Sequence, residues 1–452
     1  MSDAEHRITT LDSGVRVVSE RMPAVRSVAL GFWIATGSVF EQDSESGLSH
    51  LLEHMLFRGT KRFASAEIDQ IFDAMGAEIN AGTGKETTSV FTRVLDGHLE
   101  RALEVISDMV WRPTFGGLEA EREVVLEEIA MYEDDPQDRV FDVLGDAVFA
   151  RHPLGRPIIG HAGVVGGADA DQLTRFHAQR YVPASVVIAA AGSIEHDYLV
   201  ALVQAAGAER TGLAALPAPD APMTPQRRVR FLTKETEQYH VCLGAPGIPR
   251  HDDRRFALMV LDNILGGTSS SRLFQEVREQ RGLAYAVFSF NSHYARTGEV
   301  GLYVGTRPEN LSAALAVIAD ELHRFSEDPA TEEELVRSRE NVKGRAVLAL
   351  ESTSARMNRL GSSVLAELPI LSLDEIIERI DAVEFGDLLQ LAHELFDPAR
   401  LSAAGIGADE DTFRAALGPL GGDGDGDGVA ASATGPPADA RPARRPVGGS
   451  EA

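Results

Sequence analysis

Two histidines and a glutamate lie within one five-residue segment, and their types and spacing could bind a metal ion. The segment is His50-Leu51-Leu52-Glu53-His54. Residues four apart in an α-helix share one face, so His50 and His54 could direct two imidazole rings at a single zinc ion. Glu53 could then act on a water molecule beside that ion. Because such a segment also arises by chance, and a buried histidine is often only hydrogen-bonded, a third ligand on a second rigid element is needed.

The segment falls in a stretch whose apolar residues recur at helical spacing, which predicts an amphipathic helix. These apolar residues are Leu48, Leu51, Leu52, Met55 and Leu56. Strands are expected before it at residues 15–19 and 28–34, and a helix after it at residues 65–75. Residues 76–83 and 87–95 are rich in turn and strand formers and are expected to pair with each other.

A predicted helix at residues 118–133 offers candidates for the third ligand. Glu121, Val125 and Glu128 share one stripe of this helix. Carboxylates beside an apolar residue are partly buried, and buried carboxylates need a cation. Glu128 could complete a His-His-Glu set, and Glu121 could hydrogen-bond a ligating histidine. Glu127 remains a competing candidate, because periodicity does not exclude it.

The composition of the chain limits which binding partners and which cellular compartment are expected. The net charge of −26 argues against nucleic acid and anionic membrane surfaces as partners, and it suits a basic partner or substrate. The single cysteine, Cys242, allows no internal disulfide. The N-terminal residues lack a signal-peptide pattern, and no apolar run has the length of a membrane span. We therefore expect a cytoplasmic protein with no nucleic-acid or membrane partner.

The chain is long enough for two or three domains, and proline marks a boundary between two of them. Four prolines between residues 217 and 225 indicate an interdomain linker. We predict an N-terminal domain at residues 1–215, a linker at 216–226, a C-terminal domain at 227–418 and a disordered tail at 419–452.

The order of expected elements restarts after the linker. Strands are expected at residues 227–232 and 239–244, followed by a helix at residues 256–268. That helix carries Met259, Asp262 and Asn263 near the positions that correspond to the three residues of the histidine motif. The pattern indicates a duplicated unit whose second copy lacks the metal ligands.

Two longer motifs carry a resemblance to a known family. The segment from Glu121 to Glu128 has the pattern Glu-Arg, five further residues and Glu, some seventy residues after the histidine motif. The stretch at residues 270–285 contains Arg278 and Tyr285, seven residues apart. With these motifs the chain resembles the inverzincin metallopeptidases of the pitrilysin and insulin-degrading-enzyme superfamily. It is most similar to the catalytic subunit of the mitochondrial processing peptidase and its bacterial relatives, from about residue 8 to residue 415.

The resemblance implies roles for the residues of the metal motif. It implies one zinc ion per chain, held by His50, His54 and Glu128, with Glu128 rather than its neighbour as the third ligand. Glu53 is then the general base, and Glu121 has an auxiliary catalytic role.

The resemblance also implies a fold, an assembly and a substrate-binding surface. The fold is α+β, with two homologous sandwich domains, each a largely antiparallel sheet covered by helices on one side, that form half of a clamshell. Asn80 and Ala81 lie on an edge strand to which a peptide substrate adds. A homodimer, or a heterodimer with a paralogous chain, completes the clamshell. Arg278 and Tyr285 then hold the scissile carbonyl at the zinc of the partner chain.

The function that follows is that of a zinc endopeptidase for short unfolded or basic peptides or presequences. The alternative is a catalytically silent structural or peptide-binding scaffold of the same fold. A third interpretation is a peptide-scavenging module that hydrolyses slowly.

Overall fold

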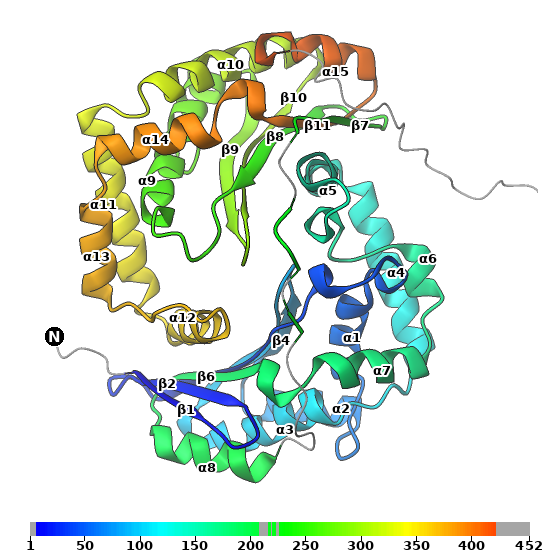
Figure 1. Cartoon of the computed structure of the whole chain (residues 1–452). Helices are drawn as coiled ribbons and strands as arrows, with labels where there is room; N and C mark the ends of the chain where they lie inside the picture. Colours follow the sequence, from blue (N-terminus) through cyan, green and yellow to red (C-terminus); the bar gives the residue numbers. More distant parts are fainter. Residues whose placement is uncertain (1–5, 208–215, 218, 223–225, 422–452) are drawn as a thin grey trace, which may run out of the picture.

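The computed structural model contains two β-sheets, one on each side of the predicted linker (Figure 1). It describes residues 6–207, 216–217, 219–222 and 226–421. Part of the predicted linker, and residues 422–452 of the predicted tail, therefore lie outside the described residues. Within the described ranges, no helix combines the length and the apolar character that crossing a membrane requires.

The first sheet has six strands in the order β1-β2-β6-β3-β5-β4. Its strands are β1 (His6–Thr10), β2 (Arg16–Arg21), β3 (Ser27–Ile34), β4 (Ile79–Thr83), β5 (Thr88–Leu95) and β6 (Val186–Gly192). The helices before the linker are α1 (Leu48–Leu56), α2 (Ser65–Ala74), α3 (Leu99–Trp111), α4 (Leu118–Asp134), α5 (Pro136–Phe149), α6 (Ala162–Gly166), α7 (Ala170–Arg180) and α8 (His196–Ala206). Strands β2 and β6 are parallel and all other pairs are antiparallel.

The second sheet repeats this arrangement with five strands in the order β7-β11-β8-β10-β9. Its strands are β7 (Val229–Thr233), β8 (Tyr239–Gly247), β9 (Ala284–His293), β10 (Gly298–Thr306) and β11 (Ser402–Gly407). The helices after the linker are α9 (Arg255–Leu265), α10 (Leu311–Glu327), α11 (Glu332–Ala349), α12 (Thr353–Leu365), α13 (Leu373–Asp381), α14 (Phe385–Leu395) and α15 (Glu410–Ala416). Apart from β1, the two sheets have the same strand order and directions. The fold is therefore α+β with a duplicated unit, as predicted.

The described residues at the start of the predicted tail pack on the second half. A short 3₁₀ turn covers Gly418–Leu420, and Leu420 is buried in the core of the second half. Because a single apolar residue leaves no periodic signal, the sequence could not show that order extends this far.

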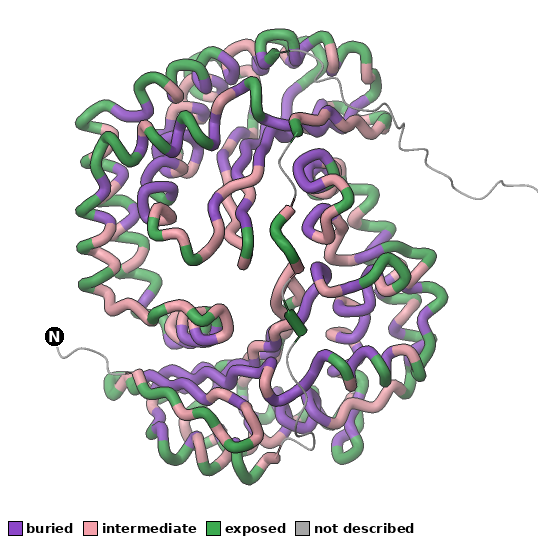
Figure 2. The backbone as a smooth tube through the Cα atoms, viewed as in Figure 1, coloured by how far each residue is buried: buried purple, intermediate pink, exposed green. Residues whose placement is uncertain are grey.

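Each sheet has a second face that is covered by a helix from the other half of the chain. Helix α12 packs on β6, β3 and β2 of the first sheet, and α5 packs on β11, β8 and β7 of the second. Figure 1 shows α12 beside β6 and α5 beside β11, and Figure 2 shows that the central strands beneath them are largely buried. We expected each sheet to be covered by helices on one side only. Each sheet instead has a further helix on its opposite face, and because α12 and α5 each come from the other half, we call this arrangement the exchange of helices.

Small residues allow α12 to approach the first sheet closely. A Cβ atom added to Gly361 would lie 2.1 Å from the indole nitrogen of Trp33, and one added to Gly31 would lie 2.6 Å from the sulfur of Met357. The packed Trp33 ring leaves no room for a side chain at position 361, whereas at position 31 the flexible end of Met357 would have to shift. The contact therefore depends on close packing of helix against strand.

A buried ion pair fixes α12 in this position. Glu20 on β2 is fully buried, and its carboxylate pairs with both Arg356 and Arg359 of α12. The Arg359 guanidinium lies 2.9 Å from one carboxylate oxygen. Since a carboxylate removed from water is costly without a cation, Glu20 needs α12 in place.

Replacing both arginines by methionine leaves Glu20 buried without a cation. The Arg356→Met/Arg359→Met variant should lose about 3–5 kcal/mol of unfolding free energy. Adding Glu20→Leu should recover most of that loss, because an apolar cluster of similar volume then replaces the ion pair. Urea unfolding followed by tryptophan fluorescence measures both, since Trp33 lies against α12. Equal stability of the double and triple variants would contradict this account.

Candidate metal centre

The start of helix α1 is fixed by a buried carboxylate and a glycine contact. Glu41 accepts hydrogen bonds from the backbone N–H of Gly47 at 2.9 Å and of Ser49 at 2.7 Å. Burial raises the pKa of Glu41 above its ordinary value, while these two hydrogen bonds lower it. Gly47 has φ 97°, and a Cβ atom there would lie 2.7 Å from the carbonyl oxygen of Ile159. The helix that carries the histidine motif therefore begins at a precise place.

Helices α1 and α4 bring the three predicted ligands together. His50 Nε2 lies 3.7 Å from one carboxylate oxygen of Glu128, and His54 Nε2 lies 3.4 Å from the other. One ligand atom from each of the three residues lies within 4.8 Å of the other two. Glu128 belongs to this cluster and its competitor Glu127 does not, although both are exposed and the expected burial holds only for Glu121. Across the described ranges, no other group of three histidine, cysteine or acidic residues is arranged to hold a metal.

Glu121 lies behind His54 and orients its ring. The Nδ1 atom of His54 lies 2.8 Å from a carboxylate oxygen of Glu121, whose side chain is 4% exposed. Arg58 pairs with the other oxygen of that carboxylate. A carboxylate accepts the proton of Nδ1, which leaves the lone pair of Nε2 directed at Glu128. Glu121 therefore contacts a predicted ligand from the side opposite to the metal position.

The donor atoms fit zinc. Burial, and to a smaller extent the nearby charge of His54, lower the pKa of His50 to about 4. The His50 ring is therefore neutral at pH 7 and keeps a lone pair for a metal. Two imidazoles with one carboxylate form a donor set that zinc prefers, with a fourth position left open.

Glu53 points into the same region and is held by a threonine. The Thr83 hydroxyl donates a hydrogen bond to a carboxylate oxygen of Glu53 at 2.5 Å. Burial raises the pKa of Glu53 above its ordinary value, and the Thr83 hydrogen bond opposes that change. A carboxyl whose pKa is moved toward neutrality is suited to accept and return a proton.

The cluster opens into a cavity of about 590 Å³ that lies between the two halves of the chain. The first half contributes the metal cluster, Glu53, the end of β4 and part of α5, and the second half contributes Phe290, Ser292 and Glu299. Four carboxylates and one ammonium group line it, and they belong to Glu53, Glu128, Asp142, Glu299 and Lys85. The cavity is thus lined mainly by acidic groups among its ionisable side chains.

The predicted substrate-binding residues of the first half lie at the sheet edge. Strand β4 is the last strand of its sheet, so its outer backbone groups face away from β5. Ala81 lines the cavity. The side chain of Asn80 is exposed and accepts a hydrogen bond from the Ala81 N–H at 2.8 Å. The edge is therefore open beside the metal cluster.

Arg278 and Tyr285 lie together, away from the cavity of their own chain. The Arg278 guanidinium donates to the Tyr285 carbonyl at 3.0 Å and lies 4.6 Å from the centre of the Tyr285 ring. Tyr285 is 77% exposed, and neither residue is among those that line the cavity with the metal cluster. The structure thus brings this pair together, but it does not bring the pair to the metal cluster.

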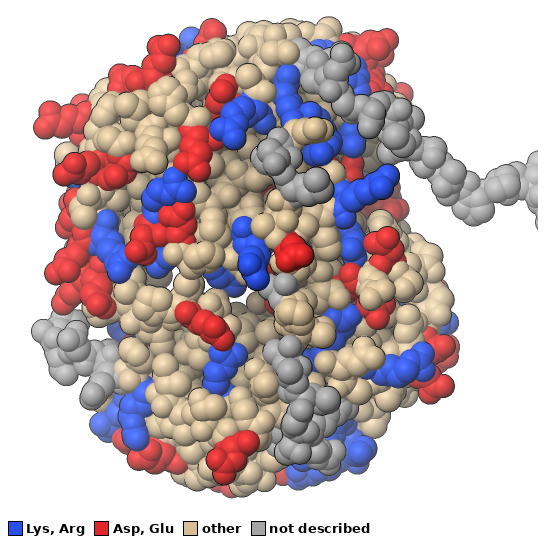
Figure 3. Space-filling model, viewed as in Figure 1, with Lys and Arg blue, Asp and Glu red and all other residues tan. Residues whose placement is uncertain are grey.

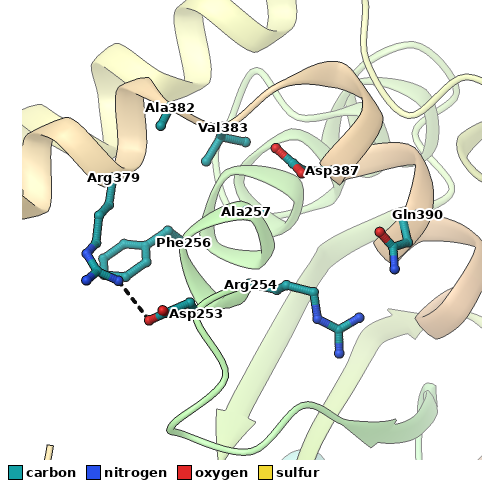
Figure 4. Close-up of a pocket in the computed structure, with 9 residues that line it drawn as sticks. All are labelled: Asp253, Arg254, Phe256, Ala257, Arg379, Ala382, Val383, Asp387 and Gln390. Carbon is teal, nitrogen blue, oxygen red and sulfur yellow. Dashed lines mark hydrogen bonds and ion pairs between the residues drawn. The ribbon is translucent and has the colours of Figure 1, made fainter.

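A second cavity lies in the second half and has a different character. Figure 4 shows Asp253 and Arg379 joined by an ion pair at its rim, with Phe256 beside them. Arg254 is also paired, with Asp252 and Glu394. The arginines at the second cavity are thus paired with carboxylates.

The surface carries both signs of charge. Figure 3 shows both signs across one face of the molecule, with acids gathered at its left edge.

Sequence reasoning missed several residues of the site. Thr83 could have been found, because strand alternation places it on the same face as Ala81. Glu41, Lys85 and Glu299 gave no local signal, since their roles depend on contacts between distant segments.

Comparisons with known proteins agree with the geometry. The profile described as insulinase, peptidase family M16, matches residues 16–162, and the profile described as peptidase M16 inactive domain matches residues 167–342. A protein named an uncharacterized zinc protease from Streptomyces coelicolor is 42% identical, with 86% of this chain and 87% of that protein covered. One of the same description from Bacillus subtilis is 41% identical, with 86% and 95% covered.

Solved structures share the fold at lower identity. A structure described as a peptidase M16 inactive domain from Pseudomonas fluorescens has a TM-score of 0.83 at 23% identity, and covers 89% of this chain and 98% of that one. A protease from Helicobacter pylori has a TM-score of 0.83 at 22% identity, with 90% and 100% covered. These two likenesses concern the two-sheet α+β fold alone.

Glu299 makes the stability of the protein depend on pH. Burial raises its pKa from 4.5 to about 7, and Lys85 opposes this change. In the folded chain Glu299 keeps its proton up to about pH 7, whereas in the unfolded chain it loses it near 4.5, so its contribution to stability falls as pH rises through that window. We expect Glu299→Gln to be more stable than wild type at pH 8 by roughly 1–3 kcal/mol, and equal to it at pH 4. Urea unfolding at both pH values measures this, and an identical difference at both would contradict it.

Proposed function

The chain belongs to the insulinase family of peptidases, family M16, and from that premise we propose that it is a zinc-dependent endopeptidase. One observation carries the proposal. His50 Nε2 and His54 Nε2 converge on the carboxylate of Glu128, and the half-buried Glu53 lies in the same cavity. We propose that the first three hold one zinc ion and that Glu53 is the general base.

The chemistry divides between the ion and the side chains. A zinc ion, when bound, lowers the pKa of a water molecule toward about 7 and polarises a peptide carbonyl. Glu53 accepts the proton of the attacking water and returns it to the leaving amine. Thr83 keeps the Glu53 carboxylate directed at the cavity. Glu121 holds the His54 ring and its tautomer, which is the auxiliary role that we assign to it.

We propose that a second copy of the chain completes the site. Tyr285 is exposed, Arg278 is partly exposed, and both lie outside the cavity of their own chain. In a homodimer the pair from one copy would stabilise the oxyanion at the zinc of the other. A paralogous chain with an equivalent pair would serve the same purpose.

The substrates we propose are short, unfolded, basic peptides, such as presequences. The cavity carries three acidic side chains besides the partly protonated Glu299, against one lysine, which favours cationic side chains. The open edge of β4 at Asn80 and Ala81 accepts an extended peptide as an additional strand. A processing-type peptidase that acts in the cytoplasm is consistent with this substrate and with the single, buried cysteine.

Glu53→Gln should bind stoichiometric zinc and lose cleavage by about 10²–10⁴-fold, because the proton acceptor is gone while the ligands remain. Elemental analysis for zinc and a quenched-fluorescence basic peptide measure the two properties. Glu128→Gln should instead lose zinc, while Glu127→Gln, one residue away and exposed, should keep both zinc and activity. An active Glu53→Gln enzyme would contradict the assignment of the base. A wild type that binds zinc and cleaves no peptide would favour the silent scaffold.

Mixing two inactive variants tests whether Arg278 and Tyr285 act across a dimer. Glu53→Gln lacks the base, and Arg278→Ala/Tyr285→Phe lacks the pair. After subunit exchange about a quarter of wild-type activity should return, since half of the dimers are mixed and each mixed dimer has one intact site. No recovery, with exchange confirmed by native mass spectrometry, would contradict sharing of the site between chains.

A further inference from the structure

The hairpin between β4 and β5 connects the proposed base to the rest of the chain. Thr83, at the end of β4, donates its hydroxyl to Glu53. The hairpin closes with the Gly84 N–H bonded to the Thr87 carbonyl at 2.8 Å. Its backbone also accepts from Ser38 N–H at 3.2 Å and Val39 N–H at 2.9 Å, through the carbonyls of Gly84 and Lys85. Any shift of this hairpin therefore moves the hydroxyl that orients Glu53.

The tip of the hairpin is held by the second half of the same chain. Both carboxylate oxygens of Glu86 accept from the backbone N–H of Ala295, at 3.0 and 3.1 Å. The Arg250 guanidinium pairs with the same carboxylate. Ala295 lies between β9 and β10, and Arg250 follows β8. The Glu86 side chain is 12% exposed, so water provides little alternative solvation.

The partners of Glu86 are themselves fixed to each other. The Arg250 N–H donates to the Tyr294 carbonyl at 2.9 Å, and the Tyr294 N–H donates to the Thr297 carbonyl at 2.8 Å. The second half thus presents a cation and an N–H group at set positions. A mostly buried carboxylate must meet such groups to offset its lost hydration, which confines the hairpin tip to one place.

We propose that Glu86 is a positioning residue that lets the second half of the chain orient the general base of the first half. This inference rests on the proposed function, because it takes Glu53 as the base. The connection runs from Arg250 and Ala295 through Glu86 to the hairpin, and from Thr83 to Glu53. Since a displacement of about 1 Å in a reacting group can cost 10²-fold in rate, anchoring of this loop is a catalytic requirement.

The rival account is that Glu86 stabilises the fold and nothing more. Glu20 offers a matched comparison, because it is also a buried carboxylate of the first half that pairs with arginine from the second half. It lies on β2, separated from β4 by three other strands of the sheet. Loss of either carboxylate weakens a contact between the halves. Of the two, only Glu86 belongs to the hairpin that also carries Thr83.

The test measures cleavage by Glu86→Gln, Glu86→Ala, Thr83→Val and the Thr83→Val/Glu86→Ala double variant, with Glu20→Gln as the control. We expect kcat to fall by about 10–100-fold in Glu86→Ala, with a smaller change in KM. Glu86→Gln should fall between wild type and Glu86→Ala, because its amide oxygen still accepts from Ala295. The double variant should be no slower than Thr83→Val alone, since both changes act on Glu53. Glu20→Gln should keep the wild-type kcat.

Hydrogen exchange gives a readout that does not depend on activity. The amides of Ser38, Val39 and Gly84 should exchange at least ~10-fold faster in Glu86→Ala than in wild type, and at the wild-type rate in Glu20→Gln. Zinc content should stay stoichiometric in both. Multiplicative losses in the double variant, or an equal loss of kcat in Glu20→Gln, would overturn the proposal. If wild type cleaves no peptide, the proposed function fails, and unchanged exchange in Glu86→Ala would separately overturn the anchoring.

Discussion

A carboxylate withdrawn from water costs several kcal/mol unless cations or N–H groups replace its hydration. This chain uses that constraint at four places, two of them beside the metal cluster and two at contacts between the halves. Glu41 meets the first N–H groups of α1 and so fixes where the histidine helix begins. Glu121 meets His54 and Arg58 and so fixes the ring that faces Glu128. Glu20 and Glu86 meet partners from the other half of the chain. The position of the cluster is therefore determined by charges that have no other low-energy arrangement.

Buried carboxylates also link the second half of the chain, which lacks the metal-ligand set, to the first half, which has it. The second sheet has the strand order of the first, but its helix α9 carries Met259, Asp262 and Asn263 in place of a ligand set. The second half makes three structural contributions instead. It provides one wall of the cavity, the partners of Glu86, and a helix that covers the open face of the first sheet. A duplicated unit without the ligand set thus contributes to the cavity and the packing of the unit that has it.

Local patterns in the sequence predicted much of this architecture, and long-range contacts account for what they missed. The helix α1 was predicted from apolar residues that recur at helical spacing, and α4 was predicted with nearly the observed bounds. The shared stripe of Glu121 and Glu128 pointed to the second element of the cluster, and the choice of Glu128 over Glu127 came from the resemblance. The exchange of α5 and α12 could not be predicted, since an apolar helix face does not say which sheet it covers. Glu86 and Glu299 were missed for the same reason: their partners are more than 160 residues away in sequence.

The exchange of helices has a consequence for the chain while it is being synthesised. The first sheet is complete when Gly192 has left the ribosome, but α12 ends at Leu365, roughly 170 residues later. At ordinary translation rates of about 5–20 residues per second, that interval lasts on the order of 10–35 s. Throughout it, one face of the sheet, with Ala29, Val187 and Ala189, has no covering helix. The nascent first half therefore keeps an apolar face uncovered until most of the second half has emerged, and only then can it reach its final fold.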